Sequence, residues 1–282
     1  MQKKPLVSVI INCFNGEKYL DNAIKSVLDQ DYKNWEIVFF DNNSSDNSYF
    51  LLKKYKDKRI KYFKTKKTYP LYKARNLAIK KSKGKLISFL DIDDWWIKSK
   101  LSKQVNIFSK NQSIEVIYSN VYLYNEIKKT RKIFIDKKIR CENLTQKLID
   151  KFEVPILSTM IKRKVFNKIK FDNRYTIIGD FDFFIRLSLE KKFLAIQEPL
   201  AYYRIHESNL TTKKIDLNIK ELKNWIFEKN KNKKFNLINF KKLYDLLIIL
   251  RIKKNIIKGN RILALKEMLQ NPFTVLYFKY IF

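Results

Sequence analysis

The chain has 282 residues, 45% of them hydrophobic, which is enough for one large or two small domains with a substantial core. No stretch approaches the ~18–20 apolar residues of a membrane span, which argues against an integral membrane protein. The net charge of +32 indicates a phosphate-rich partner such as nucleic acid, an anionic membrane or a nucleotide-linked substrate. Because most of the cations are Lys, a compositional bias of the genome explains the charge equally well.

The two cysteines, Cys13 and Cys141, lie too far apart in sequence to suggest a disulfide framework or a zinc site. The lack of a disulfide pattern favours a protein of a reducing compartment. The first residues lack the apolar region of a secretion signal. We therefore expect a cytoplasmic protein, either soluble or bound peripherally to a membrane.

The first 96 residues alternate between strand and helix patterns. Short apolar runs at 6–11, 35–40, 60–63 and 86–90 predict buried strands, and segments at 17–29, 46–55 and 71–82 predict helices. This alternation is typical of an α/β fold with a parallel sheet covered by helices. Ligands of such sheets bind beyond the carboxyl ends of the strands.

The remaining residues are less regular. The pattern predicts a helix at 98–109, a hairpin at 115–124 and 132–135, a strand at 157–161, a helix at 180–190, and strands at 193–196 and 200–205. From about Thr211 the chain becomes Lys-rich, helical and amphipathic. We therefore predict an α/β domain at 1–210 and a basic helical region at 211–282.

Three carboxylates follow the strand at 86–90, namely Asp91, Asp93 and Asp94. Like charges packed this closely repel one another, and burying them is costly without a cation. On an extended chain Asp91 and Asp93 would point to the same face and could share one hard divalent ion. The alternative is a solvated acidic turn. Polar residues also follow the first two strands, at 12–15 and 41–43, which favours a ligand site at this edge.

Several motifs in order along the chain resemble those of family 2 glycosyltransferases. They are Val-Ser-Val-Ile-Ile-Asn-Cys-Phe-Asn at 7–15, Ser-Val-Leu-Asp-Gln at 26–30, the strand at 36–41, Asn-Ser-Ser-Asp at 43–46, Ala-Arg-Asn at 74–76, Leu-Asp-Ile-Asp-Asp at 90–94, Gly-Asp-Phe-Asp at 179–182 and Tyr-Arg-Ile-His at 203–206. The resemblance implies the GT-A fold, with a Rossmann-like nucleotide-binding half at 1–96 and an acceptor-binding half at 97–210 around one mixed sheet. It also implies transfer of a sugar from a nucleotide-sugar to an acceptor hydroxyl with inversion. The family's polymerases carry Gln-x-x-Arg-Trp and transmembrane helices, and their absence here favours addition of one sugar.

The resemblance places a divalent cation, Mn²⁺ or Mg²⁺, at the acidic stretch. Such an ion would stabilise the charge that grows on the diphosphate leaving group. Asp93 would be its direct ligand, and Asp91 would bind the ribose or the metal through water. His206, the only histidine, would contact the metal or the diphosphate, or else it is structural.

The resemblance also assigns the nucleotide-binding residues. Phe14 stands at the position where family members have an aromatic side chain that packs on the base, and Asn15 next to it is also assigned to nucleotide binding. The alternative is that Phe14 is an ordinary core aromatic. Asp41 and Asn42 occupy the positions that read the base, where many members have two acids. It therefore stays open which of them reads the base, and UDP is the expected nucleotide. Arg75 would approach the nucleotide or its phosphates, or else it is a surface helix arginine.

The acceptor hydroxyl needs a general base, and a carboxylate at a helix N-terminus can remove its proton. The resemblance assigns this role to Asp180, with Asp182 as the alternative residue. Asp180 also stands where a helix cap would.

The basic tail predicts binding to an anionic membrane, at the inner face of the plasma membrane, with a helical subdomain packed on the core as the alternative. We favour a packed subdomain whose basic face meets the membrane, with a lipid-linked glycan as acceptor, as in assembly of bacterial lipopolysaccharide or capsule. A nucleic-acid-binding protein is disfavoured, because acids cluster where cations would be needed. A catalytically silent glycan- or nucleotide-binding relative is disfavoured by the intact acids Asp91, Asp93 and Asp180.

Overall fold

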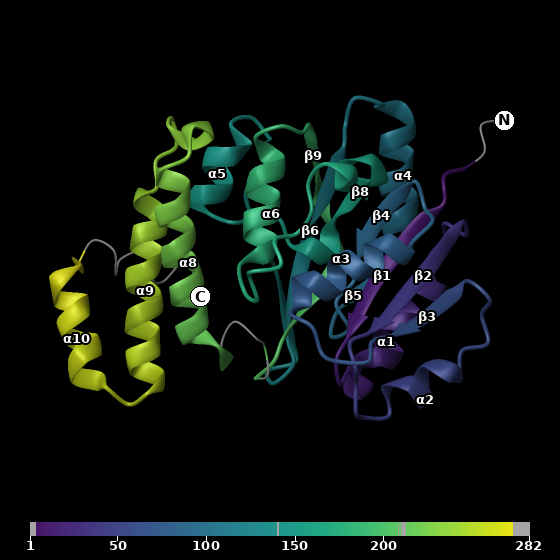
Figure 1. Ribbon diagram of the computed structural model, residues 1–282, viewed down its shortest axis with the longest axis horizontal. Coiled ribbons are helices and arrows are strands. Elements are labelled where there is room, and N and C mark those ends of the chain that lie inside the picture. The colour runs from purple at the N-terminus through teal and green to yellow at the C-terminus, as the bar shows by residue number, and fades with distance from the viewer. Residues whose placement is uncertain (1–3, 140, 208, 210–212, 273–282) are drawn as a thin grey trace. The chain divides into compact units, whose positions relative to one another are not determined.

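The computed structural model describes residues 4–139, 141–207, 209 and 213–272 (Figure 1). The chain divides into two compact units. Unit 1 comprises residues 1–142 and 153–206, and unit 2 comprises residues 143–152 and 207–282. The boundary predicted at residues 210 and 211 lies outside the described residues.

The first half of unit 1 has the predicted β-α-β alternation. Its parallel strands stand in the order β3-β2-β1-β4, with β1 and β4 as direct neighbours. The elements are β1 (Val7–Cys13), α1 (Glu17–Leu28), β2 (Trp35–Asp41), α2 (Ser48–Lys53), β3 (Ile60–Lys64), α3 (Leu71–Lys81) and β4 (Leu86–Phe89). The carboxyl ends of β1, β2 and β4 therefore meet at one edge of the sheet.

The second half of unit 1 extends the same sheet in mixed directions. Beyond β4 the order is β8-β6-β9-β5, with β8 antiparallel to β4 and β9 parallel to β6. The elements are β5 (Trp95–Trp96), α4 (Lys100–Lys110), β6 (Val116–Asn125), β7 (Thr130–Ile133), η1 (Ile156–Ser158), β8 (Met160–Lys162), η2 (Arg163–Asn167), α6 (Gly179–Ser188) and β9 (Phe193–Ile205). The predicted α/β fold with a mixed central sheet and a hairpin, here β6 and β7, is confirmed.

Two predicted elements differ from the structure. The strand predicted at 157–161 is present only in its second part, as β8 from Met160. Its first residues belong to the short helix η1, where the Ser158 hydroxyl donates to the Pro155 carbonyl and the Thr159 hydroxyl to the Ile156 carbonyl. The two strands predicted at 193–196 and 200–205 are one strand, β9. Its pairing with β6 shifts register near Asn120 and Pro199, where the alternation of side chains is interrupted.

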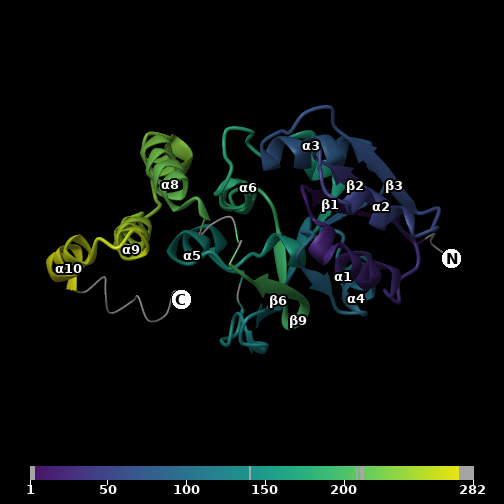
Figure 2. The ribbon, with the colours of Figure 1, turned by 90° about the horizontal axis from the view of Figure 1, so that it is seen from below.

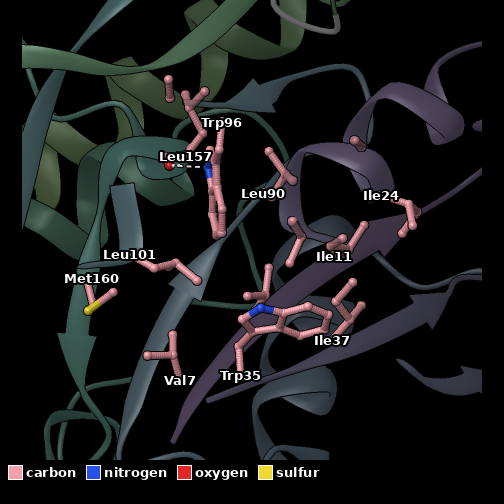
Figure 3. Packing of buried hydrophobic residues seen from close by; sticks show 14 of the residues in the cluster. Val7, Ile11, Ile24, Trp35, Ile37, Leu90, Trp96, Leu101, Leu157 and Met160 are labelled. Atoms are coloured by element: carbon pink, nitrogen blue, oxygen red, sulfur yellow. Dashed lines mark hydrogen bonds between the residues drawn. The ribbon is translucent and has the colours of Figure 1, made fainter. Parts of the chain in front are cut away.

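The core lies between the sheet and α1. Alternate residues of β1, from Val7 to Cys13, are buried against the apolar face of α1, which includes Leu20 and Ile24. Figure 3 shows Trp35 and Trp96 within this cluster, and the Trp96 indole donates a hydrogen bond to the carbonyl of Leu157 at 2.9 Å. This packing fixes the ends of β1 and β4, from which the site is built.

Unit 2 is helical. It contains α5 (Leu144–Asp150), α8 (Ile215–Asn230), η3 (Lys233–Phe235), α9 (Lys241–Ile257) and α10 (Arg261–Gln270). Helix α9 lies between α8 and α10 (Figures 1 and 2), and Trp225 of α8 packs edge-on against the rings of Phe235 and Phe240. Among the helices described, none is long and apolar enough to cross a membrane.

Candidate active site

The acidic stretch forms a turn at the end of β4. The strand ends at Phe89, and the amide of Asp94 donates to the carbonyl of Asp91 at 3.1 Å. The extended conformation that would point Asp91 and Asp93 to one face is therefore wrong. In the turn, the charge of Asp93 still acts on Asp91. Burial raises the pKa of Asp91 above its ordinary value, Arg75 opposes this rise, and the charge of Asp93 adds to it.

Arg75 connects the acidic turn to the start of α6. Its guanidinium contacts Asp91 Oδ1 at 2.6 Å and Asp180 Oδ1 at 2.7 Å, and the residue is 1% exposed. The rings of Tyr72, Phe89 and Phe171 surround it within 6 Å. Arg75 is therefore not a surface helix arginine.

Asp180 lies in the first turn of α6 and keeps access to solvent. Its side chain is 23% exposed, and only Oδ1 contacts Arg75. Burial raises the pKa of Asp180 to about 6, with Asp91 adding to the rise and Arg75 opposing it. Ile178 occupies the N-cap position and no side chain caps the helix, so the cap alternative is wrong.

Asp182 has different surroundings. Its side chain is 1% exposed and pairs with Arg186, one turn later in α6, at 2.7 Å. Of the two carboxylates proposed as base, Asp180 is the one that a substrate hydroxyl can reach.

Two residues of helix α3, Tyr72 and Asn76, hold the segment that leads into α6. The Tyr72 hydroxyl donates to the carbonyl of Ile177 at 3.1 Å, and the Asn76 amide donates to the carbonyl of Phe171 at 2.8 Å. A Cβ on Gly179 would lie 2.3 Å from the Tyr72 ring, so only glycine allows this approach. The Ala-Arg-Asn motif thus holds the segment that carries Asp180.

The end of β9 holds the acidic turn from the opposite side. Arg204 Nε donates to the carbonyl of Asp93 at 2.7 Å, and the amide of Arg204 donates to Asp94 Oδ1 at 2.8 Å. His206 Nε2 lies 2.9 Å from Asp93 Oδ2. The structure therefore brings together His206 and Asp93, the two residues for which the sequence predicted a metal or diphosphate contact.

The donor atoms of this turn suit Mn²⁺ or Mg²⁺. Within the described part of the chain, no three His, Cys, Asp or Glu side chains form a metal cluster by themselves. Such ions at phosphate sites commonly take one or two carboxylates and complete their shell with phosphate and water oxygens. Asp93, with Asp91 and His206 beside it, supplies such a partial set, so these residues fit the ion. Asp94, 1% exposed and bonded to Arg204, is part of the support of the turn.

The residues that the sequence analysis expected to bind the nucleotide fall into two groups. Phe14 is 54% exposed, so it is not a core aromatic and its ring is available to a ligand. The side chains of Asn15, Asp41 and Asn42 are instead engaged in hydrogen bonds within the protein, and those of Asn15 and Asn42 join neighbouring loops. The side-chain oxygen of Asn15 accepts from the Ser45 amide at 2.9 Å. The side-chain amide of Asn42 donates to the Tyr69 carbonyl, and its oxygen accepts from the Tyr69 amide.

Asp41 is completely buried at the end of β2. One of its oxygens accepts from the Ser44 amide and the other from the Tyr62 hydroxyl, each at 2.7 Å. These bonds hold the loop after β2 in shape. A carboxylate with both oxygens engaged and no exposed surface is a poor candidate for reading a base edge directly.

Sequence analysis missed several residues that build the site. Tyr72, Asn76 and Arg204 position other residues, a role that the sequence analysis did not assign. Asn76 and Arg204 belong to the quoted motifs at 74–76 and 203–206, and Tyr72 stands two residues before the first of these. Both amide atoms of Asn12 are buried and have no hydrogen-bond partner in the described structure. A polar residue at the end of an otherwise apolar strand was the available signal.

Comparisons with known proteins identify the family of this chain. The family model described as glycosyl transferase family 2 matches residues 8–191. A glycosyltransferase of Methanocaldococcus jannaschii is 33% identical over 207 residues, covering 72% of this chain and 71% of that protein. The Escherichia coli protein WfgD, a UDP-Glc:alpha-D-GlcNAc-diphosphoundecaprenol beta-1,3-glucosyltransferase, is 32% identical over 222 residues, covering 77% of this chain and 83% of that protein.

Solved structures show the same fold. S. aureus TarS in complex with UDP-GlcNAc superposes with a TM-score of 0.67 at 17% identity, covering 95% of this chain and 78% of that one. The mannosyltransferase PcManGT from Pyrobaculum calidifontis, in complex with GDP-Man and Mn²⁺, gives a TM-score of 0.64 at 13% identity, covering 96% and 76%. The predicted GT-A fold is confirmed, and the chain is a glycosyltransferase that belongs to family 2.

Proposed function

We propose that the enzyme transfers one sugar from a nucleotide-sugar to an acceptor hydroxyl with inversion, using Asp180 as the general base. The observation that carries this proposal is the Arg75 bridge, which joins Asp91 of the acidic turn to Asp180 at 2.6 and 2.7 Å. We assign Asp91 to the side of the leaving group and Asp180 to the side of the acceptor. Inversion needs these two functions on opposite faces of the anomeric carbon.

The environment of Asp180 suits proton abstraction. A pKa of about 6 leaves the carboxylate ionised at neutral pH and makes it a stronger base than an ordinary aspartate. The acceptor oxygen bonds to the anomeric carbon while the bond to the diphosphate oxygen breaks, and Asp180 takes the hydroxyl proton. The products are the glycosylated acceptor and the nucleoside diphosphate, with the proton on Asp180.

Asp93 would hold Mn²⁺ or Mg²⁺, with Asp91 and His206 beside it, and the bound ion would supply charge stabilisation for the departing diphosphate. Arg204 keeps Asp93 in place through its main-chain carbonyl. Asp91, held by Arg75, would bind the ribose or a metal-bound water.

The nucleotide would stack on the exposed ring of Phe14. Asn15, Asp41 and Asn42 contribute by fixing the loops around the base. UDP is our expected nucleotide, supported by the UDP-linked donors named for WfgD and TarS, although PcManGT was solved with GDP-Man.

For the acceptor we propose a lipid-linked precursor of a surface glycan, bound by the half of unit 1 that follows residue 96. WfgD is named for a diphosphoundecaprenol-linked acceptor, and a 32% identical Bacillus subtilis relative is named for teichuronic acid biosynthesis. Such acceptors are anchored in a membrane. The basic unit 2 supports peripheral attachment of the enzyme to the anionic inner face of the plasma membrane.

A donor screen tests the proposal. The purified enzyme is incubated with UDP-, GDP- and dTDP-sugars, with Mn²⁺, with Mg²⁺ or with EDTA, and nucleoside diphosphate release is measured with a lipid-linked acceptor. We expect release from a UDP-sugar that requires the metal and the acceptor. No release from any donor would favour a catalytically silent relative, and release unaffected by EDTA would contradict the metal assignment.

A further inference from the structure

Helix α10 presents an apolar stripe that nothing in the described structure covers. Ile262, Leu265 and Leu269 are 85%, 58% and 73% exposed, and their spacing of three and four residues places them on one face of the helix. On the other side of α10, Ala264 is 3% exposed, where the helix packs against α9. The helix therefore buries its small residue and exposes its large ones.

Cations border this stripe. At about 100° per residue, Arg261 and Lys266 lie on its two sides. The one acid of α10, Glu267, faces Arg251 of α9 at 3.8 Å and lies away from the stripe. The face of α10 thus combines apolar and positive groups.

We propose that this stripe, Ile262, Leu265 and Leu269 with Arg261 and Lys266, is the surface by which the protein docks on an anionic lipid bilayer. A helix that lies in the interface buries its apolar side chains below the headgroups and leaves bordering cations at headgroup level. A lipid surface fits both chemistries, whereas nucleic acid offers nothing to the leucines. A second copy is disfavoured, because two chains of net charge +32 repel each other.

This inference deepens the proposed membrane attachment by assigning it to one helix face. The test is flotation of the full chain with vesicles of phosphatidylglycerol and phosphatidylcholine at low salt. Leu265→Glu is compared with Leu237→Glu, which makes the same change at a leucine that is 98% exposed elsewhere in unit 2. We expect wild type and Leu237→Glu to float, and Leu265→Glu to bind at least about tenfold more weakly, equivalent to about 1.4 kcal/mol.

A neutral variant separates apolar contact from charge. Ile262→Gln/Leu265→Gln/Leu269→Gln keeps good helix formers and the net charge, so it should also lose vesicle binding. Arg261→Gln/Lys266→Gln should weaken binding to anionic vesicles in particular. Equal binding by all variants would overturn the assignment to α10, as would failure of the wild type to bind.

Two further results would identify another occupant and refute the proposal. If the neutral variant changed a dimer to a monomer in light scattering, the stripe would be a contact between copies. If it lowered the unfolding temperature without altering flotation, another part of the chain would cover it. Leu265→Glu should retain wild-type nucleotide release with a water-soluble acceptor analogue, so a failure of docking and a failure of the proposed catalytic activity are distinguishable.

Discussion

At the scale of single residues, the site depends on a buried cation between two carboxylates. A guanidinium that is 1% exposed must be paired, and here Asp91 and Asp180 both pair with it. The same contacts limit how far burial raises the pKa of either acid, because Arg75 opposes the rise at both. Arg75 thus acts as a positioning residue for the proposed base.

Replacing Arg75 by Gln should therefore have two effects. We expect a loss of about 2–4 kcal/mol in the free energy of unfolding, less than for a wholly buried triad because both acids keep some contact with solvent. The pKa of Asp180 should rise above about 6, because its opposing cation is gone. Denaturant unfolding and the pH–rate profile measure these effects, and a profile with an unmoved acid limb would contradict the positioning role.

The wild-type pH profile follows from the same residue. The base must be ionised, so kcat/KM for the acceptor should fall about tenfold per pH unit below about 6 and level off above it. Protonation of Asp180 on the acid side removes activity, and raising the pH restores it. An activity that stays constant between pH 5 and 7 would exclude Asp180 as the titrating base.

Ordered motifs in the sequence identified these candidate residues, but the sequence did not predict the contacts between them. Arg75 is far from Asp180 along the chain, and sequence distance does not indicate which acids it pairs with. Likewise, nothing local distinguishes Asp41, buried with both oxygens bonded, from an acid that faces a ligand. Such assignments depend on packing between segments far apart in the chain.

At the scale of elements, the loop after β2 allows a test of whether Asp41 reads the nucleotide base directly. Asp41→Asn keeps the shape but presents an amide where Ser44 or Tyr62 needs an acceptor. We expect it to cost about 1–3 kcal/mol of stability, whereas the exposed Asp136→Asn should cost nothing measurable. Nucleotide selectivity, measured as UDP against GDP affinity, should be retained. A stable variant with altered selectivity would show that Asp41 reads the base.

The docking of α6 on α3 gives a second element-scale prediction. Gly179→Ala places a methyl group into the Tyr72 ring and must displace the turn that carries Asp180. We expect a loss of about 1–3 kcal/mol together with a lower kcat. In a Tyr72→Leu background the loss should largely disappear. A double-mutant cycle of unfolding free energies measures this coupling, and additive effects would refute the contact.

Element prediction from sequence succeeded where the hydrophobic period was long and regular, as in β1, α1 and β2. It failed where tertiary context decides. β5 has two residues, which is too short for any periodic signal. The first part of an apolar run belongs to η1, where the hydroxyls of Ser158 and Thr159 bond to the main chain, and β9 continues through Pro199 because a register shift accommodates it.

At the scale of the whole molecule, sequence analysis found the change of composition near Thr211 but not the early segment of unit 2. Helix α5, at Leu144–Asp150, groups with the C-terminal helices and contacts α9. Its composition resembles that of its sequence neighbours, so only the tertiary structure could assign it. The charge of +32 likewise indicated a partner class, and only the structure showed an exposed apolar face on α10 for which we propose a lipid partner.

The proposed mechanism depends on two separate roles: Asp180 is the base for the acceptor hydroxyl, and the acidic turn binds the diphosphate side of the donor. The most direct test compares sugar transfer and nucleotide affinity in the wild type, in Asp180→Asn and in the control Asp136→Asn. We predict that Asp180→Asn lowers transfer about 10²–10⁴-fold while binding the nucleotide within a few-fold of wild type, because the base acts on the acceptor alone. Transfer by Asp180→Asn at the wild-type rate would contradict the account.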